Sequence, residues 1–306
     1  MREITLDLVA VRLRALTWGP ETGRLVVLLH GFPDTAHTWR HLGPALADAG
    51  RRVVAPFTRG YAPSAVPADR SGHIAALMDD AAAIHTHLGG GTDAVIVGHD
   101  WGAITANALA AHPDSPFTAS VALAVPPFRS LRKRAALPML PRQVRNSWYT
   151  LFNQIPVLPE RYAQPLIRRL WSDWSPGYDA SADLPAVMAA IGDAAHRSAV
   201  IGYYRCVARP LPRVPARYRR WAGAEMRLPV VPTLYLHGAD DGCIDPRFAA
   251  LVGESLPAGS QVHLVRGAGH FLHLEQPGAV NERILAFLAG QARCDDGGRA
   301  ERRDPG

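Results

Sequence analysis

The run from Val95 to Gly102, Val-Ile-Val-Gly-His-Asp-Trp-Gly, constrains the fold of this chain more than any other stretch. Its leading apolar residues suit a buried parallel strand, and the alanine-rich residues 103–111 suit a helix. Gly98 and Gly102 stand two residues on either side of Asp100. A sharp strand-to-helix turn can therefore bring their backbones together, because no Cβ atoms collide. Such a turn places the side chain of Asp100 above the end of a sheet.

A carboxylate in this position can attack carbon directly and form an ester, without a neighbouring base to deprotonate it first. The alternative is that Asp100 caps the helix that follows, because aspartate is a preferred N-cap residue. The turn alone leaves both interpretations open, and the rest of the chain has to decide between them.

Apolar runs alternate with helical patterns along most of the chain. We expect the first two runs to form an antiparallel pair and the others to form parallel strands. This rhythm predicts an α/β fold with a mostly parallel, doubly wound sheet of eight strands flanked by helices. The expected strands are 4–8, 11–18, 25–29, 52–57, 95–98, 117–125, 230–237 and 261–265.

Residues 128–226 interrupt this rhythm. They hold six of the eight tyrosines and four of the seven tryptophans, with many arginines and prolines and no clear strand. We interpret them as a helical lid that is inserted after the sixth strand and covers the carboxyl edge of the sheet. The expected domains are therefore a core of 1–127 and 227–290, the lid, and a disordered tail over the glycine-rich, charged residues 291–306.

The net charge of +6 comes almost entirely from arginine, since Lys133 is the only lysine. Much of this charge falls between Arg129 and Arg220. A solvated basic face is the ordinary explanation, and an acidic ligand or an anionic membrane surface are alternatives that stay open. The chain has no zinc-finger spacing and no RNA-binding aromatic motif, so we expect no nucleic-acid partner.

The three cysteines, Cys206, Cys243 and Cys294, are odd in number and lack metal-ligand spacing. The N-terminus lacks the apolar core of a signal peptide, and no apolar run approaches the ~20 residues of a membrane span. We therefore expect reduced thiols in a cytoplasmic protein, a monomer or homodimer, with no integral membrane segment, metal or cofactor.

Three chemically useful residues each follow a predicted strand. Asp100, Asp241 and His270 come in the chain order nucleophile, acid, histidine. An ester on Asp100 must be hydrolysed, and histidine titrates near neutral pH, so it can activate the water. A carboxylate on the far ring nitrogen would fix the tautomer of that histidine. By residue type alone, Asp240 serves as well as Asp241.

The stretch His30-Gly31-Phe32-Pro33 follows the strand expected at 25–29. Gly31 allows a sharp turn, and Pro33 fixes the direction of the chain after it. The backbone N–H of Phe32 could then face a developing negative charge at the sheet edge. A plain strand-to-helix corner is the alternative.

Taken together, these motifs resemble the α/β-hydrolase superfamily and, within it, the epoxide hydrolases of the soluble type. Residues 30–33 resemble the oxyanion-hole motif of that family, and residues 98–102 resemble its nucleophile motif. Residues 238–241 resemble its acid loop, which selects Asp241, and residues 267–271 resemble its histidine motif. The similarity covers most of residues 20–290.

The resemblance also implies two tyrosines in the lid that donate protons to the substrate. The segment Ser147–Pro156 resembles the first tyrosine segment of the family and selects Tyr149, and Ile201–Arg205 resembles the second and selects Tyr204. A neutral phenol can protonate the alkoxide that forms when an epoxide opens. Packing on one helical stripe is the alternative role for Tyr204.

The implied activity is conversion of an apolar epoxide and water to a vicinal diol, without a cofactor. Phe32 and Trp101 would supply the backbone donors of the oxyanion hole. The residues expected to contact the substrate are His30, Pro33, Trp148 and Phe128.

Two other functions remain open from the sequence. A haloalkane dehalogenase-like enzyme would use the same Asp–His chemistry, with Trp101 holding the halide. Many such enzymes carry asparagine where this chain has Phe32, and they lack the tyrosine pair. A non-catalytic receptor of this fold usually lacks one of the reactive residues, and none is missing here.

Overall fold

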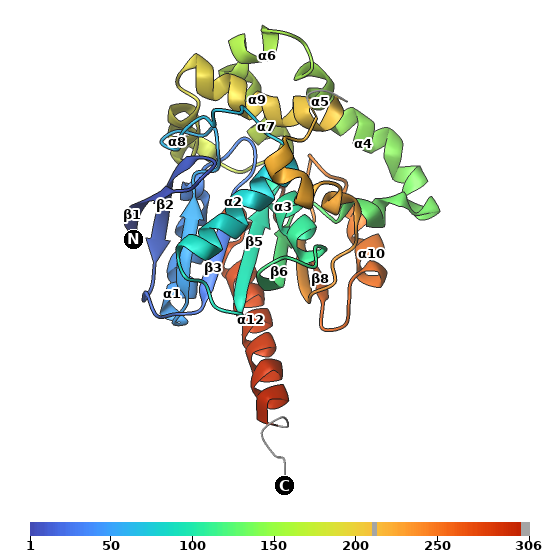
Figure 1. Ribbon diagram of the computed structural model, residues 1–306. Coiled ribbons are helices and arrows are strands. Elements are labelled where there is room, and N and C mark those ends of the chain that lie inside the picture. The colour runs from blue at the N-terminus through green and yellow to red at the C-terminus, as the bar shows by residue number, and fades with distance from the viewer. Residues whose placement is uncertain (210–212, 301–306) are drawn as a thin grey trace.

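A single sheet of eight strands forms the centre of the computed structural model (Figure 1). The structure describes residues 1–209 and 213–300, with residues 292–300 described by backbone alone. The strands are β1 (Arg2–Asp7), β2 (Arg12–Trp18), β3 (Leu25–Leu29), β4 (Arg52–Pro56), β5 (Ala94–His99), β6 (Phe117–Leu123), β7 (Thr233–Gly238) and β8 (Gln261–Val265). Their order is β1-β2-β4-β3-β5-β6-β7-β8. The pairs β1–β2 and β2–β4 are antiparallel and the others parallel, which confirms the predicted sheet.

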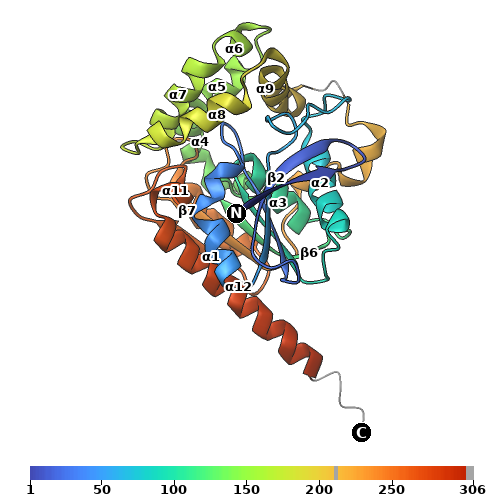
Figure 2. The same cartoon turned by 90° about the vertical axis from the view of Figure 1, so that its left-hand side faces the viewer.

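Helices cover both faces of the sheet, so its central strands are buried on both sides and are apolar throughout. In β3, Val27 and Leu29 belong to one core, which includes residues of α2 (Ile74–His87) and α3 (Trp101–Ala110). Val26 and Leu28 belong to the core on the opposite face, with residues of α1 (Leu42–Asp48) and α12 (Pro277–Ala300) (Figure 2).

The segment between β6 and β7 forms helices and no strand in its described residues, 128–209 and 213–226. Its elements are η2 (Phe128–Arg132), η3 (Arg134–Met139), α4 (Leu140–Asn146), α5 (Trp148–Phe152), α6 (Leu158–Arg161), α7 (Ala163–Trp174), η4 (Ala180–Ala182), α8 (Leu184–Ala190), α9 (Ala194–Ala208), η5 (Ala216–Trp221) and η6 (Ala224–Met226). In Figure 1 most of these helices lie above the carboxyl ends of the strands. Buried hydrogen bonds join the segment to the core. Among them, the Trp171 indole donates to the Pro33 carbonyl at 2.8 Å, and the Tyr203 hydroxyl donates to the Arg59 carbonyl at 2.7 Å.

The C-terminal part of the chain differs from the prediction. Helix α12 continues to Ala300, so residues 291–300 are helical where a disordered tail was expected. Lengthening an existing helix needs no new nucleus, and alanine, glutamine and arginine in this stretch favour helix. The rest of the predicted tail, residues 301–306, lies outside the described residues.

Among the side chains that the structure describes, Cys206 and Cys243 are buried free thiols. The side chain of Cys294 lies outside that set. No helix in the described part of the chain is both long enough and apolar enough to cross a lipid bilayer.

The predicted elbow is present between β5 and α3. A Cβ atom placed on Gly98 would lie 2.0 Å from the carbonyl oxygen of Gly102, and one placed on Gly102 would lie 2.0 Å from that of Leu29. Both contacts are with backbone, which cannot swing aside. The two glycines therefore allow strand and helix to meet at Asp100.

We expect Gly102→Ala to lower the free energy of unfolding by about 3 kcal/mol, because the new methyl group overlaps a backbone carbonyl. Gly202→Ala is the matched control: it lies inside α9, and an added Cβ there meets nothing within 4 Å. The control should gain about 0.5–1 kcal/mol from the better helix propensity of alanine. Urea denaturation measures both changes, and equal stabilities of the two variants would contradict the role given to Gly102.

Candidate active site

Asp100 carries its carboxylate at the point where the elbow turns. Its backbone has φ 53° and ψ −115°, a left-handed conformation that is unusual for a residue with a side chain. Asp100 is the N-cap residue of α3, but its side chain forms no capping hydrogen bond. Held strain of this kind costs about 1–3 kcal/mol and is concentrated at functional sites. Helix capping therefore does not account for the aspartate.

The two carboxylate oxygens of Asp100 have different partners. Oδ1 accepts a hydrogen bond of 2.8 Å from the backbone N–H of Phe32, in the loop after β3. Oδ2 lies 3.5 Å from Nε2 of His270. The loop approaches closely because Gly31 has no side chain: a Cβ atom there would lie 2.4 Å from the Cβ of Asp100. One oxygen is thus held by the loop, and the other faces the histidine.

His270 and Asp241 form the other half of the site. Nδ1 of His270 lies 3.0 Å from Oδ2 of Asp241, and both side chains are fully buried. The other oxygen of Asp241 accepts hydrogen bonds from the backbone N–H groups of Cys243 and Ile244, at 2.7 and 3.0 Å. Asp240 is exposed. The structure therefore brings Asp241, and not Asp240, to the histidine.

The electrostatic balance at His270 favours its charged form. Burial by itself lowers the pKa of His270, but the carboxylates of Asp241 and Asp100 outweigh it and raise the pKa to about 10. For Asp241, burial raises the pKa, and the attraction of His270 and His237 outweighs it, so the pKa of Asp241 lies well below its usual range. The free site thus holds two carboxylates around one imidazolium.

Tyr149 on α5 and Tyr204 on α9 reach the site from the inserted helical segment. Their rings meet edge to face with centroids 5.6 Å apart. The Tyr204 ring also contacts Phe32 at 5.1 Å and Trp101 at 5.2 Å, the residues that flank Asp100 in space and in sequence. Burial raises the pKa of both hydroxyls well above 10, so both tyrosines are neutral donors at pH 7.

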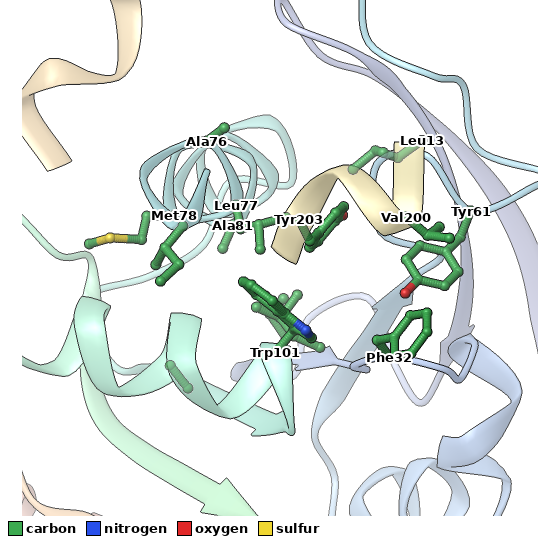
Figure 3. Packing of buried hydrophobic residues seen from close by; sticks show 14 of the residues in the cluster. Leu13, Phe32, Tyr61, Ala76, Leu77, Met78, Ala81, Trp101, Val200 and Tyr203 are labelled. Carbon is green, nitrogen blue, oxygen red and sulfur yellow. The ribbon is translucent and has the colours of Figure 1, made fainter. Parts of the chain in front are cut away.

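The hydroxyls of Tyr149, Tyr203 and Tyr204 have different surroundings. Tyr203 also packs edge to face on Trp101, but its hydroxyl is committed to the Arg59 carbonyl, and Figure 3 shows it within the buried core. The Tyr204 hydroxyl is buried with no hydrogen-bond partner among the described residues. The Tyr149 hydroxyl lies 3.4 Å from Sγ of Cys243. Of these three hydroxyls, that of Tyr204 therefore has the most freedom to bind a new oxygen.

Two residues that were expected to contact the substrate, His30 and Phe128, have other contacts in the structure. Both ring nitrogens of His30 bind backbone, with the Gly31 carbonyl at 2.9 Å and the Thr58 N–H at 3.0 Å, so the ring supports the loop. Burial lowers the pKa of His30 to about 4, which keeps that ring neutral. Phe128 lines a cavity with Ile74 and Cys206, and its lining includes no residue of the triad Asp100, Asp241 and His270.

Pro33, Trp148 and Trp101 are the remaining predicted site residues. Pro33 is buried and accepts the Trp171 indole hydrogen bond through its carbonyl. The Trp148 ring is half-buried, with the Arg169 guanidinium 5.0 Å above it. The backbone N–H of Trp101 forms no hydrogen bond to Asp100 in the described part of the chain, so its role in the oxyanion hole stays a prediction.

A buried polar cluster that we had not predicted lies behind the triad. Asp34, His99 and His273 each offer one ligand atom, and these atoms lie within 4.8 Å of one another. Asp34 Oδ2 and Nδ1 of both histidines lack a protein partner. Nε2 of His99 binds the carbonyl of His270 at 3.0 Å, which connects the cluster to the triad. No other group among the described residues has the geometry to hold a metal ion.

The sequence also did not predict two residues that support His270, Trp174 and His237. The carbonyl of Trp174, at the end of α7, accepts hydrogen bonds from the backbone of His270 at 3.0 Å and of Gly242 at 3.1 Å. Nε2 of His237 lies 3.2 Å from Oδ2 of Asp241, the same oxygen that faces His270. No sequence pattern pointed to Trp174, because only the tertiary fold brings its carbonyl to His270. For His237 the pattern was weak: it ends the strand that was predicted before the acid loop.

The chain matches the family model described as alpha/beta hydrolase fold over residues 24–277. Epoxide hydrolase A of Mycobacterium tuberculosis is 31% identical, over 94% of this chain and 97% of that protein. Epoxide hydrolase 3 of Mus musculus is 27% identical, over 91% of this chain and 74% of that protein.

Solved structures have the same architecture. The crystal structure of Epoxide Hydrolase A from Mycobacterium thermoresistibile aligns with a TM-score of 0.73 at 25% identity, covering 94% of this chain and 98% of that one. An epoxide hydrolase structure from Vigna radiata aligns with a TM-score of 0.76 at 22% identity, covering 94% and 98%, and shows the shared fold alone.

The titration of His270 tests the charge balance of the site. Its folded pKa of about 10 lies above the ordinary 6.5, so its protonation stabilises the fold fully below about pH 6.5 and is lost as the pH approaches 10. Asp100→Asn removes one of the two carboxylates that raise this pKa, and Asp241→Asn removes the other. Nitrogen NMR of the imidazole should show a lower pKa in both variants. An unchanged titration in Asp100→Asn would disprove the coupling.

Proposed function

The chain belongs to the α/β-hydrolase fold family, and we propose that it is an epoxide hydrolase that converts an apolar epoxide and water to a vicinal diol. The observation that carries the proposal is an elbow carboxylate, Asp100, in the same enclosure as two buried, neutral tyrosine hydroxyls. A carboxylate attacks carbon, and a phenol protonates the oxygen that leaves carbon. An epoxide needs both at once.

In the first step, Oδ2 of Asp100 attacks a ring carbon of the epoxide, and the bond from that carbon to the epoxide oxygen breaks. Tyr204, whose hydroxyl has no other partner, donates a proton to the leaving oxygen, and Tyr149 donates a second hydrogen bond. The products are a hydroxyalkyl ester and a tyrosinate. The proton on His270 restores the tyrosinate to a phenol.

The second step uses the change of charge caused by the first. The ester no longer carries the negative charge of Asp100, which is one of the groups that raise the pKa of His270. The histidine, now neutral, takes a proton from a water that attacks the ester carbon. The Phe32 N–H stabilises the charge that forms on Oδ1, to which it is already bonded. Expulsion of the diol returns the carboxylate and the protonated histidine.

The tyrosine pair favours epoxide over halide as the leaving group. A departing halide needs no proton, so phenols of raised pKa would contribute little to dehalogenation. A receptor without catalysis would gain nothing from the strained backbone of Asp100. The described geometry therefore supports hydrolysis of an epoxide best among these three functions.

One turnover in heavy-oxygen water identifies the nucleophile. The first diol should contain an unlabelled oxygen from Asp100, and peptide mass spectrometry should find the label in the Asp100 carboxylate. Label in the diol with none in Asp100 would mean that water attacks the epoxide directly.

His270→Gln should slow hydrolysis far more than alkylation, because only the second step needs a base. The hydroxyalkyl ester should then accumulate and add the mass of one substrate to the intact protein. Normal turnover by this variant, with no added mass, would remove His270 from the mechanism.

Tyr149→Phe and Tyr204→Phe should each slow alkylation of Asp100 about 10²–10³-fold, since each removes one donor to the developing charge. The double variant should be nearly inactive, with folding measured by circular dichroism. Tyr203→Phe is the matched control: it keeps the same ring contact with Trp101 and loses a hydroxyl that binds backbone. Its stability should fall by about 1 kcal/mol while its alkylation rate stays within a few-fold of the parent.

A panel of epoxides and haloalkanes, assayed for diol and halide, separates the two hydrolytic functions. Halide release from haloalkanes with no diol from any epoxide would replace the proposed function by dehalogenation. Neither product, with no adduct on Asp100, would favour the receptor.

A further inference from the structure

The positive charge of this protein is concentrated in one lobe, residues 128–162, which we call the outer lobe. It contains seven basic residues and one acidic residue, a net charge of +6, which equals the net charge of the whole chain. The lobe comprises η2, η3 and α4 to α6, and Figure 1 shows α4 and α6 at the periphery of the molecule.

Most of this charge is not neutralised within the protein. Lys133 pairs with Glu254, Arg142 lies near Asp245, and the one acidic residue, Glu160, pairs with Arg205. Five exposed arginines form no ion pair with any described residue: Arg129, Arg132, Arg134, Arg145 and Arg161. Their charge is available to a partner outside the chain.

The same lobe exposes large apolar side chains. Eight of the thirteen strongly exposed ones in the described chain lie in it: Leu137, Leu140, Val144, Leu151, Ile155, Val157, Leu158 and Tyr162. Leu137, Leu140 and Val144 follow a spacing of three and four residues, so they share one face of the continuous η3–α4 helix. Their exposed fractions are 59%, 41% and 67%. Exposed apolar residues gathered in this way mark an interaction surface.

One of the exposed apolar residues, Val157, has a strained backbone. Val157 has φ 66°, a left-handed conformation that is costly for a β-branched residue, and its side chain is 72% exposed. It stands between Ile155 and Leu158, which are also exposed. Strained residues are concentrated at functional sites, so the backbone of Val157 agrees with a role for this surface in binding.

We propose that the outer lobe docks this protein peripherally on an anionic lipid surface. Aliphatic side chains enter the boundary between headgroups and acyl chains, while arginines bind the phosphates around them. A second copy of the chain fits less well, because a two-fold interface would press the same positive surface against itself. Nucleic acid would leave the aliphatic side chains without a role, since Tyr162 is the one strongly exposed aromatic residue here for bases to stack on.

Helix α5 connects this surface to the chemistry. Its residue Tyr149 is 5% exposed and points into the site, whereas Leu151, two residues later, is 71% exposed on the outer side. Docking would place the outer face of this helix against the medium in which apolar epoxides dissolve. That consequence rests on the proposed function, but the docking itself does not, and binding can be measured without substrate.

Sedimentation with lipid vesicles tests the proposal on the full chain. The protein should bind phosphatidylcholine vesicles that contain about 30 mol% phosphatidylglycerol, and bind pure phosphatidylcholine vesicles at least tenfold more weakly, because each basic residue near an anionic surface strengthens binding about fivefold. Raising NaCl from about 0.1 M to about 1 M shortens the Debye length from about 10 Å to about 3 Å and should release most of the protein.

Two variants test the basic and the apolar residues of the surface separately. Arg132→Gln with Arg145→Gln should weaken binding to the anionic vesicles by about tenfold or more. Leu137→Ser with Val144→Ser and Leu151→Ser should have an effect of similar size, since three apolar side chains lose their burial in lipid. All five residues are exposed, so both variants should keep the melting temperature of the parent.

Matched controls make the same changes elsewhere on the surface. These are Arg219→Gln with Arg266→Gln, and Val9→Ser with Val230→Ser and Leu264→Ser, all at exposed positions. The controls should bind like the parent. Equal losses in the controls, equal binding to both kinds of vesicle, or no binding at low salt would overturn the proposal. A dimer seen by light scattering that the apolar lobe variant abolishes would instead assign the surface to a second copy.

Discussion

The burial of a carboxylate at Asp100, which is 5% exposed, is the constraint on which the rest of the structure depends. A buried charge is costly unless it is paired and hydrogen-bonded. Asp100 has both kinds of partner, a backbone N–H on one oxygen and His270 facing the other. Both partners come from other strand ends, and parallel strands bring those ends to one edge of the sheet. The order of the strands thus brings together the partners that offset the cost of burying this charge.

The inserted helical segment also helps to keep the Asp100 carboxylate buried. It covers the site with aromatic rings, and it also holds the site together, since the carbonyl of Trp174 binds the backbone of His270. Removal of the segment would both admit water to the carboxylates and loosen the histidine. The hydroxyls of Tyr149 and Tyr204 stay neutral at pH 7, because burial raises the pKa of each.

The sequence predicted the parts of the site that depend on local backbone chemistry. The glycines around Asp100 and the glycine before Phe32 have steric causes that a short motif contains, so the elbow and the loop could be read directly. The choice of Asp241 over Asp240 needed a family resemblance, because both residues look alike in sequence. Sequence could not show that His30 supports a loop or that Asp34, His99 and His273 meet, since those outcomes depend on which buried atoms find partners. The helical residues 291–300 were missed because their composition resembles that of a disordered tail.

The geometry of the elbow has a consequence for how this scaffold can change its chemistry. The steric conditions are met by glycines at 31, 98 and 102, and none of them is set by the identity of the residue at 100. Position 100 can therefore hold different short side chains that carry a nucleophilic group. An aspartate arrives already charged and directs the scaffold to saturated carbon, whereas a serine would have to be deprotonated by the histidine and would direct it to acyl carbon. A single codon could therefore separate two classes of reaction, while the sheet, the acid and the histidine stayed as they are.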